Sequence, residues 1–142
     1  MPDTSMKDVV AQMARSVAGI WMVTLVDSDC MVLASWQSPD NKVSPESLGG
    51  FIQIFTNTMN IFKQQTPVGF TRFDDIIFST TVLHQMIKPI ADANCFIVVS
   101  APRSVPLGMI RTAIANYAPK LEQTLPGREP SPRKDGIGTV IP

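Results

Sequence analysis

The chain has 142 residues, which is the length of one ordinary domain. Hydrophobic residues make up 44% of it and charged residues 17%, so a packed core is expected and a chain disordered throughout is excluded. The 12 lysines and arginines balance the 12 aspartates and glutamates. This balance gives no reason to expect binding to nucleic acid or to anionic lipid.

Targeting signals and disulfides are not indicated. The opening MPDTSMKDVV has neither the basic nor the apolar region of a signal peptide. No apolar run approaches the ~20 residues that a membrane-spanning helix needs. Cys30 and Cys95 lie in or beside apolar runs without C-x-x-C spacing, which favours free thiols in a reducing compartment. We therefore expect a cytoplasmic protein without membrane insertion.

The N-terminal part predicts a helix followed by a β-hairpin. Ser5 and Asp8 have capping-box spacing, and the apolar residues that follow recur at helical intervals, so a helix is predicted over 5–18. Gly19 should stop it. Residues 20–26 are apolar on both faces, which is typical of an inner strand, and residues 31–36 return as a second strand. The intervening DSDC turns the chain.

The second helix has more apolar surface than one sheet can cover. It begins at Ser44-Pro45-Glu46, which combines a cap, a proline at the first helical position and an acidic first turn, and it runs to about Gln65. At about 100° per residue its apolar arc spans roughly 180°, whereas packing on one sheet needs little more than about 100°. The excess predicts a second neighbour.

The second half of the chain predicts three strands and a helix. The strands cover 73–80, 82–90 and 95–100, and the continuous apolar run CFIVVS indicates that the last of these is central. A final helix is capped by Ser104 and reaches Leu121, and Pro119 should kink or shorten it. The fold class is an α/β (α+β) sandwich with a mainly antiparallel five-stranded sheet in the order α-β-β-α-β-β-β-α.

The chain is expected to form one domain over 1–125. Residues 126–142, PGREPSPRKDGIGTVIP, are rich in proline and glycine, poor in large apolar residues and nearly balanced in charge. They are predicted to be a flexible C-terminal tail.

No constellation in the sequence points to catalysis. His84 is the only histidine, and its neighbours in the chain offer no catalytic partner, so a structural role is expected. Asp27 and Asp29 are interpreted as turn formers, and Asp74 and Asp75 should point to opposite faces of a strand. Zinc spacing and nucleotide-binding motifs are both missing. We predict a non-enzymatic protein without a metal or cofactor.

The element order resembles that of the roadblock/dynein light chain domain over about residues 5–125. The best local matches are VDSDCMVLAS at 26–35 and LGMIR at 107–111. The family usually has glycine where this chain has Cys30. A longer or differently shaped turn can avoid positive φ at this residue, so the resemblance leaves the conformation of the turn open. The resemblance implies that the second helix covers one sheet face and that the first and third helices cover the other.

The resemblance also implies a homodimer. Two second helices would lie antiparallel, and two sheets would join through their third strands, which removes an open sheet edge. The residues expected at this interface are Phe51, Ile54, Thr58, Ile61, Asp75 and Ile77. The residues of the second helix expected to face its own sheet are Leu48, Ile52, Phe55, Met59 and Phe62. A heterodimer with a paralogue remains a possibility.

The resemblance implies that this protein is a non-enzymatic platform that binds other proteins. Bacterial members of the family resemble regulators of small Ras-like GTPases. Such a regulator can raise the hydrolysis rate by fixing switch loops, without supplying an arginine. The expected partner surface is the outer side of the second helix, with Gln53, Asn57, Asn60 and Gln64. The alternatives are a light-chain-like adaptor without GTPase regulation, a profilin- or PAS-like small-molecule sensor and, last, a small enzyme using Cys30 or Cys95.

Overall fold

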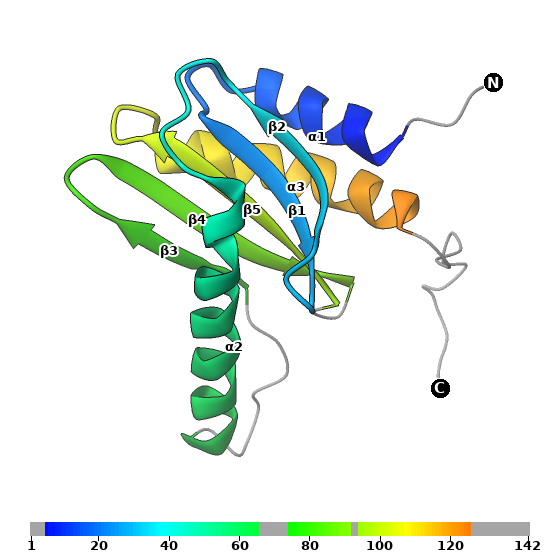
Figure 1. Ribbon diagram of the computed structural model, residues 1–142, viewed down its shortest axis with the longest axis vertical. Helices are drawn as coiled ribbons and strands as arrows, with labels where there is room; N and C mark the ends of the chain where they lie inside the picture. The colour runs from blue at the N-terminus through cyan, green and yellow to red at the C-terminus, as the bar shows by residue number, and fades with distance from the viewer. Residues whose placement is uncertain (1–4, 66–73, 92–93, 126–142) are drawn as a thin grey trace.

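The computed structural model describes residues 5–65, 74–91 and 94–125, and shows one sheet with helices on both faces (Figure 1). The predicted order of helices and strands is confirmed, with one short 3-10 turn added. The elements are α1 (Met6–Arg15), β1 (Met22–Asp27), β2 (Val32–Gln37), η1 (Pro45–Ser47), α2 (Leu48–Gln65), β3 (Ile76–Ser79), β4 (Leu83–Ile90), β5 (Cys95–Pro102) and α3 (Leu107–Thr124). The predicted tail, 126–142, lies outside the described residues.

The sheet is antiparallel at every described pairing, in the strand order β2-β1-β5-β4-β3. β5 is central and β1 has a neighbour on each side, which confirms both predictions. Their burial explains the continuous apolar runs, because strands covered on both faces have no solvent-facing side. β2 and β3 are left at the two edges.

Each inner strand contributes to two hydrophobic cores. Val23 and Leu25 of β1 pack on the side of α1 and α3, while Met22 and Val26 pack on the side of α2. This division follows from the strand geometry, in which successive side chains point to opposite faces. The arrangement that the family resemblance implied, with one long helix on one face and two on the other, is confirmed. None of the helices among the described residues is long and apolar enough to span a bilayer.

The helix starts behave largely as their sequences predict. The Ser5 hydroxyl accepts the backbone N–H of Asp8 at 3.1 Å and so caps α1. The Ser44 hydroxyl accepts a hydrogen bond from the backbone N–H of Glu46 and donates one to the Glu46 carboxylate. The bond from the Ser44 hydroxyl is the larger cause of the lowered pKa of this carboxyl, and the bond from the Glu46 backbone is the smaller one. Ser104 is not the cap of α3, since Pro106 occupies that position without a side-chain bond.

The ends of α1 and α3 differ from prediction, whereas α2 ends at the predicted Gln65. α1 stops at Arg15, three residues before the predicted end at Ala18, and Gly19 continues the turn at φ +94°. A Cβ at Gly19 would lie 3.1 Å from a Val105 methyl, so both backbone and space favour glycine. α3 continues past Pro119 to Thr124, because the side chain of Leu121 is fully buried in the core and holds the last turns in place.

The turn between β1 and β2 uses cysteine in a conformation that suits glycine. Cys30 has φ +67°, which answers the question that the sequence left open about this turn. The role of Asp27 as turn former is confirmed: its Oδ1 accepts the N–H groups of Asp29 at 2.9 Å and Met31 at 3.0 Å. The Cys30 thiol lies 3.8 Å from the carbonyl oxygen of Gly49 and links the turn weakly to α2.

Replacing Cys30 with glycine is expected to stabilise the protein by up to about 1 kcal/mol. A left-handed conformation costs a non-glycine residue about 1–2 kcal/mol, part of which is offset by the greater freedom of glycine in the unfolded chain. The matched control is Cys30→Ala, which removes the same thiol but retains a Cβ. Urea denaturation should rank glycine above alanine, and the reverse order would show that the thiol contact outweighs the backbone strain.

Candidate partner-binding surface

One side of α2 faces its own sheet. Leu48, Ile52 and Phe55 are buried there, and Phe55 packs edge-to-face on Phe96 of β5 with ring centroids 5.4 Å apart. Met59 is partly buried against the same core. These placements confirm the predicted sheet-facing residues for the N-terminal part of the helix.

The predicted position of Phe62 against the sheet is wrong. Its side chain is 42% exposed. The C-terminal half of α2 extends beyond the sheet, so that none of the described strands lies beneath it (Figure 1). The spacing along the helix was read correctly, but the sheet ends before the helix does.

A second side of α2 is apolar and exposed. Ile54 is 48% exposed and Ile61 52% exposed. Seven residues make nearly two turns, so these two side chains lie within about 20° of each other around the helix axis. Thr58 lies between them, and its hydroxyl donates to the carbonyl of Ile54 at 2.8 Å. The Thr58 hydroxyl therefore has its hydrogen bond within the helix. A partner can bury the exposed apolar stripe of Ile54, Thr58 and Ile61 without leaving a polar group unpaired.

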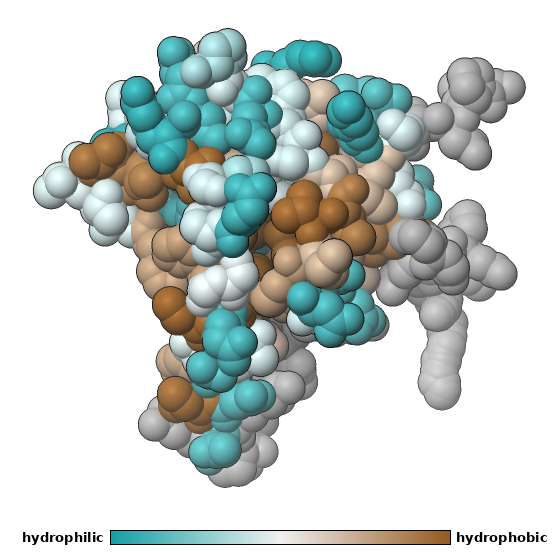
Figure 2. Space-filling model, viewed as in Figure 1, coloured by the Kyte–Doolittle hydropathy of each residue, from teal (hydrophilic) through white to brown (hydrophobic). Residues whose placement is uncertain are grey.

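An aromatic contact joins this exposed stripe to the free edge of the sheet. Phe51 of α2 and Phe78 of β3 have ring centroids 5.4 Å apart, and both side chains are half-buried. Figure 2 shows hydrophobic side chains along this side of α2. The apolar side of α2 and the edge strand β3 therefore form one continuous surface, which we call the α2–β3 surface: Phe51, Ile54, Thr58 and Ile61 with Ile76 and Phe78.

The two interface residues predicted on the third strand lie on its α3 side. Ile77 is half-buried against the core beneath α1 and α3. The Asp75 carboxylate lies 3.5 Å from Nε of Arg111 on α3. Because the Arg111 side chain is more than half exposed, this ion pair contributes little to stability. β3 begins at Ile76 rather than at Phe73, which lies outside the described residues.

The third side of α2 carries four carboxamides. Gln53, Asn57, Asn60 and Gln64 are all exposed and recur every three or four residues, so they form one stripe. Lys63 is the only charged residue in the sequence of α2. A helix surface this poor in charge suits contacts by neutral hydrogen bonds, which salt screens much less than ion pairs.

Among the residues considered for catalysis, His84 and Cys30 make contacts that link elements of the fold. His84 is buried, and its Nδ1 lies 2.7 Å from the hydroxyl of Ser79, which joins β4 to β3. Cys30 and Cys95 do not form a disulfide. Within 5–65, 74–91 and 94–125, no three His, Cys, Asp or Glu side chains are grouped so that they could hold a metal ion.

Sequence reasoning missed two apolar contributors to the α2–β3 surface. These are Ile76 and Phe78, which fall in the predicted strand 73–80, whereas the interface residues predicted on that strand were Asp75 and Ile77. The alternation along β3 could have indicated Phe78, because it shares the α2-facing side with Ile76.

Comparison with known proteins shows the fold. No family model matches the chain, and no curated protein matches its sequence. Among solved structures, MglB with a tetrameric arrangement superposes at a TM-score of 0.72 with 14% identity, covering 84% of this chain and 86% of that one. MglB of Myxococcus xanthus gives 0.68 with 16% identity, over 82% and 90%.

A Roadblock/LC7 domain of Streptomyces avermitilis gives a TM-score of 0.64 with 10% identity, over 82% of this chain and 94% of that one. Two profilins share the general arrangement at lower scores, 0.54 and 0.57. The MglB and Roadblock/LC7 structures superpose on most of this chain. The chain therefore has the roadblock/LC7 fold.

Proposed function

We propose that this protein is a non-enzymatic cytoplasmic scaffold that forms a homodimer through the α2–β3 surface and binds a small Ras-like GTPase. The observation that carries the proposal is the exposed apolar stripe of Ile54 and Ile61, which continues through the Phe51–Phe78 contact to the free strand β3. Exposed apolar side chains beside an unpaired strand favour association.

A second copy of the chain fits this surface by symmetry. In an antiparallel pair of α2 helices related by a two-fold axis near Thr58, Ile54 of one copy lies opposite Ile61 of the partner subunit. The same axis allows the two β3 strands to pair edge to edge, which joins two five-stranded sheets into one. Asp75 and Ile77 then lie at the junction of the two sheets.

The carboxamide stripe supplies the surface for the GTPase. In the proposed dimer, Gln53, Asn57, Asn60 and Gln64 stay outside the helix pair, because they lie on a different side of α2 from Ile54 and Ile61. Two copies would present two such stripes side by side. A regulator of this type acts by holding the switch loops of the GTPase in position, so it needs no catalytic residue of its own.

The test of GTPase regulation uses the purified full chain and the small GTPases encoded beside its gene, each loaded with GDP or a GTP analogue. We expect binding that depends on the nucleotide, or altered hydrolysis. The Gln53→Ala, Asn60→Ala double variant should weaken binding about tenfold, because two interfacial hydrogen bonds are lost. Its elution volume in size-exclusion chromatography should not change.

If these GTPases neither bind nor change their hydrolysis rate, GTPase regulation is ruled out for them and the adaptor alternative is favoured. That alternative retains the dimer but predicts a different protein partner. The sensor alternative has less support, because the space between α2 and the sheet is filled by the buried side chains of Leu48, Ile52 and Phe55.

A further inference from the structure

The sheet has a second free edge, at β2. This strand pairs only with β1, at the end of the sheet opposite β3. Ser38 donates its N–H to the carbonyl of Trp21 at 2.8 Å. Since antiparallel bonding alternates along a strand, Ser35 and Gln37 direct their N–H and C=O groups away from β1, and this alternation ends at Leu33, where the β1–β2 register shifts. Among the described residues, no backbone bond outside the sheet reaches Ser35 or Gln37.

The beginning of this edge is apolar and exposed. Met31 is 63% exposed, Val32 44% and Leu33 37%, and they are consecutive. Figure 2 shows a hydrophobic area on the β1–β2 side of α2. Natural proteins usually protect edge strands with lysine, proline or a covering element, and the MVLASW run at 31–36 contains neither of these residues. An exposed apolar edge of this kind marks a binding site.

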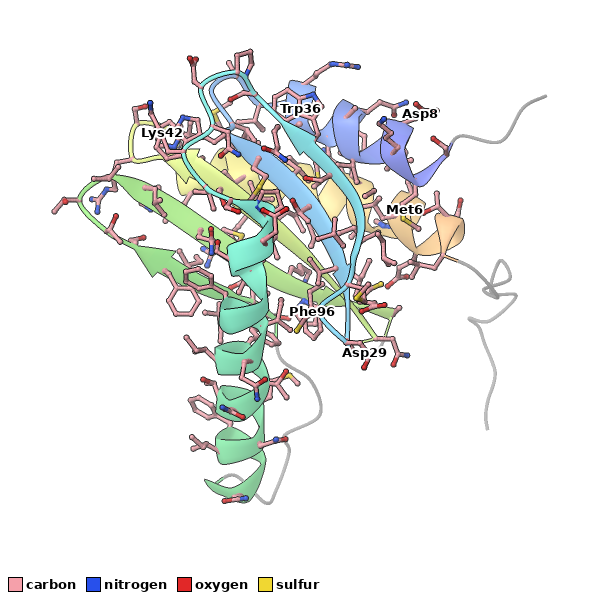
Figure 3. The ribbon with its side chains drawn as sticks, in the orientation of Figure 1. Met6, Asp8, Asp29, Trp36, Lys42 and Phe96 are labelled. Carbon is pink, nitrogen blue, oxygen red and sulfur yellow. The ribbon has the colours of Figure 1, made fainter. Side chains whose placement is uncertain are left out.

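The charged residues in and next to β1 and β2 in the sequence are all negative. Between Arg15 and Lys42 there is no lysine, arginine or histidine, whereas Asp27, Asp29 and Asp40 are present. The bond from the N–H of Met31 holds the Asp27 carboxylate next to the apolar start of β2. Asp29 is exposed at the tip of the hairpin, and Trp36 lies at the other end of β2 (Figure 3). A positive group therefore complements the end of the edge near Met31.

We propose that β2 is a second docking surface, which takes an extended apolar segment of a partner protein with a lysine or arginine at the end near Asp29. The segment adds a sixth strand. Its backbone bonds to Ser35 and Gln37 provide affinity, and its contacts with Met31, Leu33 and Asp29 provide specificity. The proposal does not depend on the proposed dimer, because β2 lies at the far edge from β3 and stays open when two β3 strands pair.

The test uses the full chain labelled with ¹⁵N and the peptide acetyl-VTVTVKK-amide as the probe. We expect chemical-shift changes concentrated in residues 31–37. A peptide with glutamate in place of both lysines should bind at least about tenfold more weakly at low salt, since it places like charges beside the aspartates. Leu33→Lys should abolish the shifts, because an edge lysine blocks strand addition. Met109→Lys, which places a lysine at another exposed apolar position, should bind normally.

Several results would overturn the proposal. The proposal is wrong if the chemical-shift changes fall outside residues 31–37, or if the lysine and glutamate peptides bind equally well. It is also wrong if the Leu33→Lys variant binds the lysine peptide normally. Amide-exchange protection of residues 31–37 that rises with protein concentration would show that a second copy covers the edge. Binding of the probe only after removal of 126–142 would show that the chain covers its own edge, and would also overturn the proposal.

Discussion

Replacing both Ile54 and Ile61 with lysine is expected to convert the proposed dimer into a monomer. Each isoleucine is about half exposed in the single chain, so the change should cost the fold little, whereas in the dimer it would place four charges along the helix pair. Burying unpaired charges costs several kcal/mol, so the dissociation constant should rise at least about 100-fold. Multi-angle light scattering across a concentration series measures this directly.

The matched control places lysines on the carboxamide side of the same helix. Gln53→Lys with Asn60→Lys adds the same charge to α2 but lies outside the proposed helix pair, so the dimer should persist. An unchanged dimer in the Ile54→Lys, Ile61→Lys variant would show that the chain associates through some other surface. A monomeric wild-type chain at micromolar concentration would contradict the homodimer itself.

Replacing Phe55 with alanine should cost about 3–5 kcal/mol of stability, the range for removing a buried phenylalanine. Its side chain is fully buried, and its ring packs on Phe96 at the centre of the core beneath α2. Domains of this size are stable by about 5–15 kcal/mol, so the variant should be marginal at 37 °C. Urea denaturation followed by circular dichroism measures the loss.

Phe62 provides the comparison, because it is the same residue type on the same helix but lies past the end of the sheet. Phe62→Ala should cost the isolated fold much less than Phe55→Ala, since its side chain is 42% exposed. The two variants should therefore be measured at a protein concentration where the chain is monomeric. Equal losses would show that the C-terminal half of α2 packs on the domain after all.

The sequence predicted most of the local structure, and the reasons can be assigned to particular residues. The alternation and the continuous apolar runs of 20–26 and 95–100 marked the inner strands, because burial on both faces leaves no polar positions. The Ser5 and Ser44 caps marked helix starts through bonds that span only two or three residues. The sequence also placed the tight turn at Cys30, but it did not determine the conformation of the turn, and only the structure shows its positive φ.

The sequence alone determined that α2 has more apolar surface than one sheet can cover, because helical periodicity is a local property. Only the tertiary structure decided where that surplus lies. The sheet ends before the helix does, which exposes Phe62, and the Phe51–Phe78 contact joins the Ile54–Ile61 stripe to the edge strand β3. The tertiary structure likewise determined that β2 lies at an edge of the sheet. Whether a strand is paired depends on contacts between segments far apart in the chain, which local patterns do not encode.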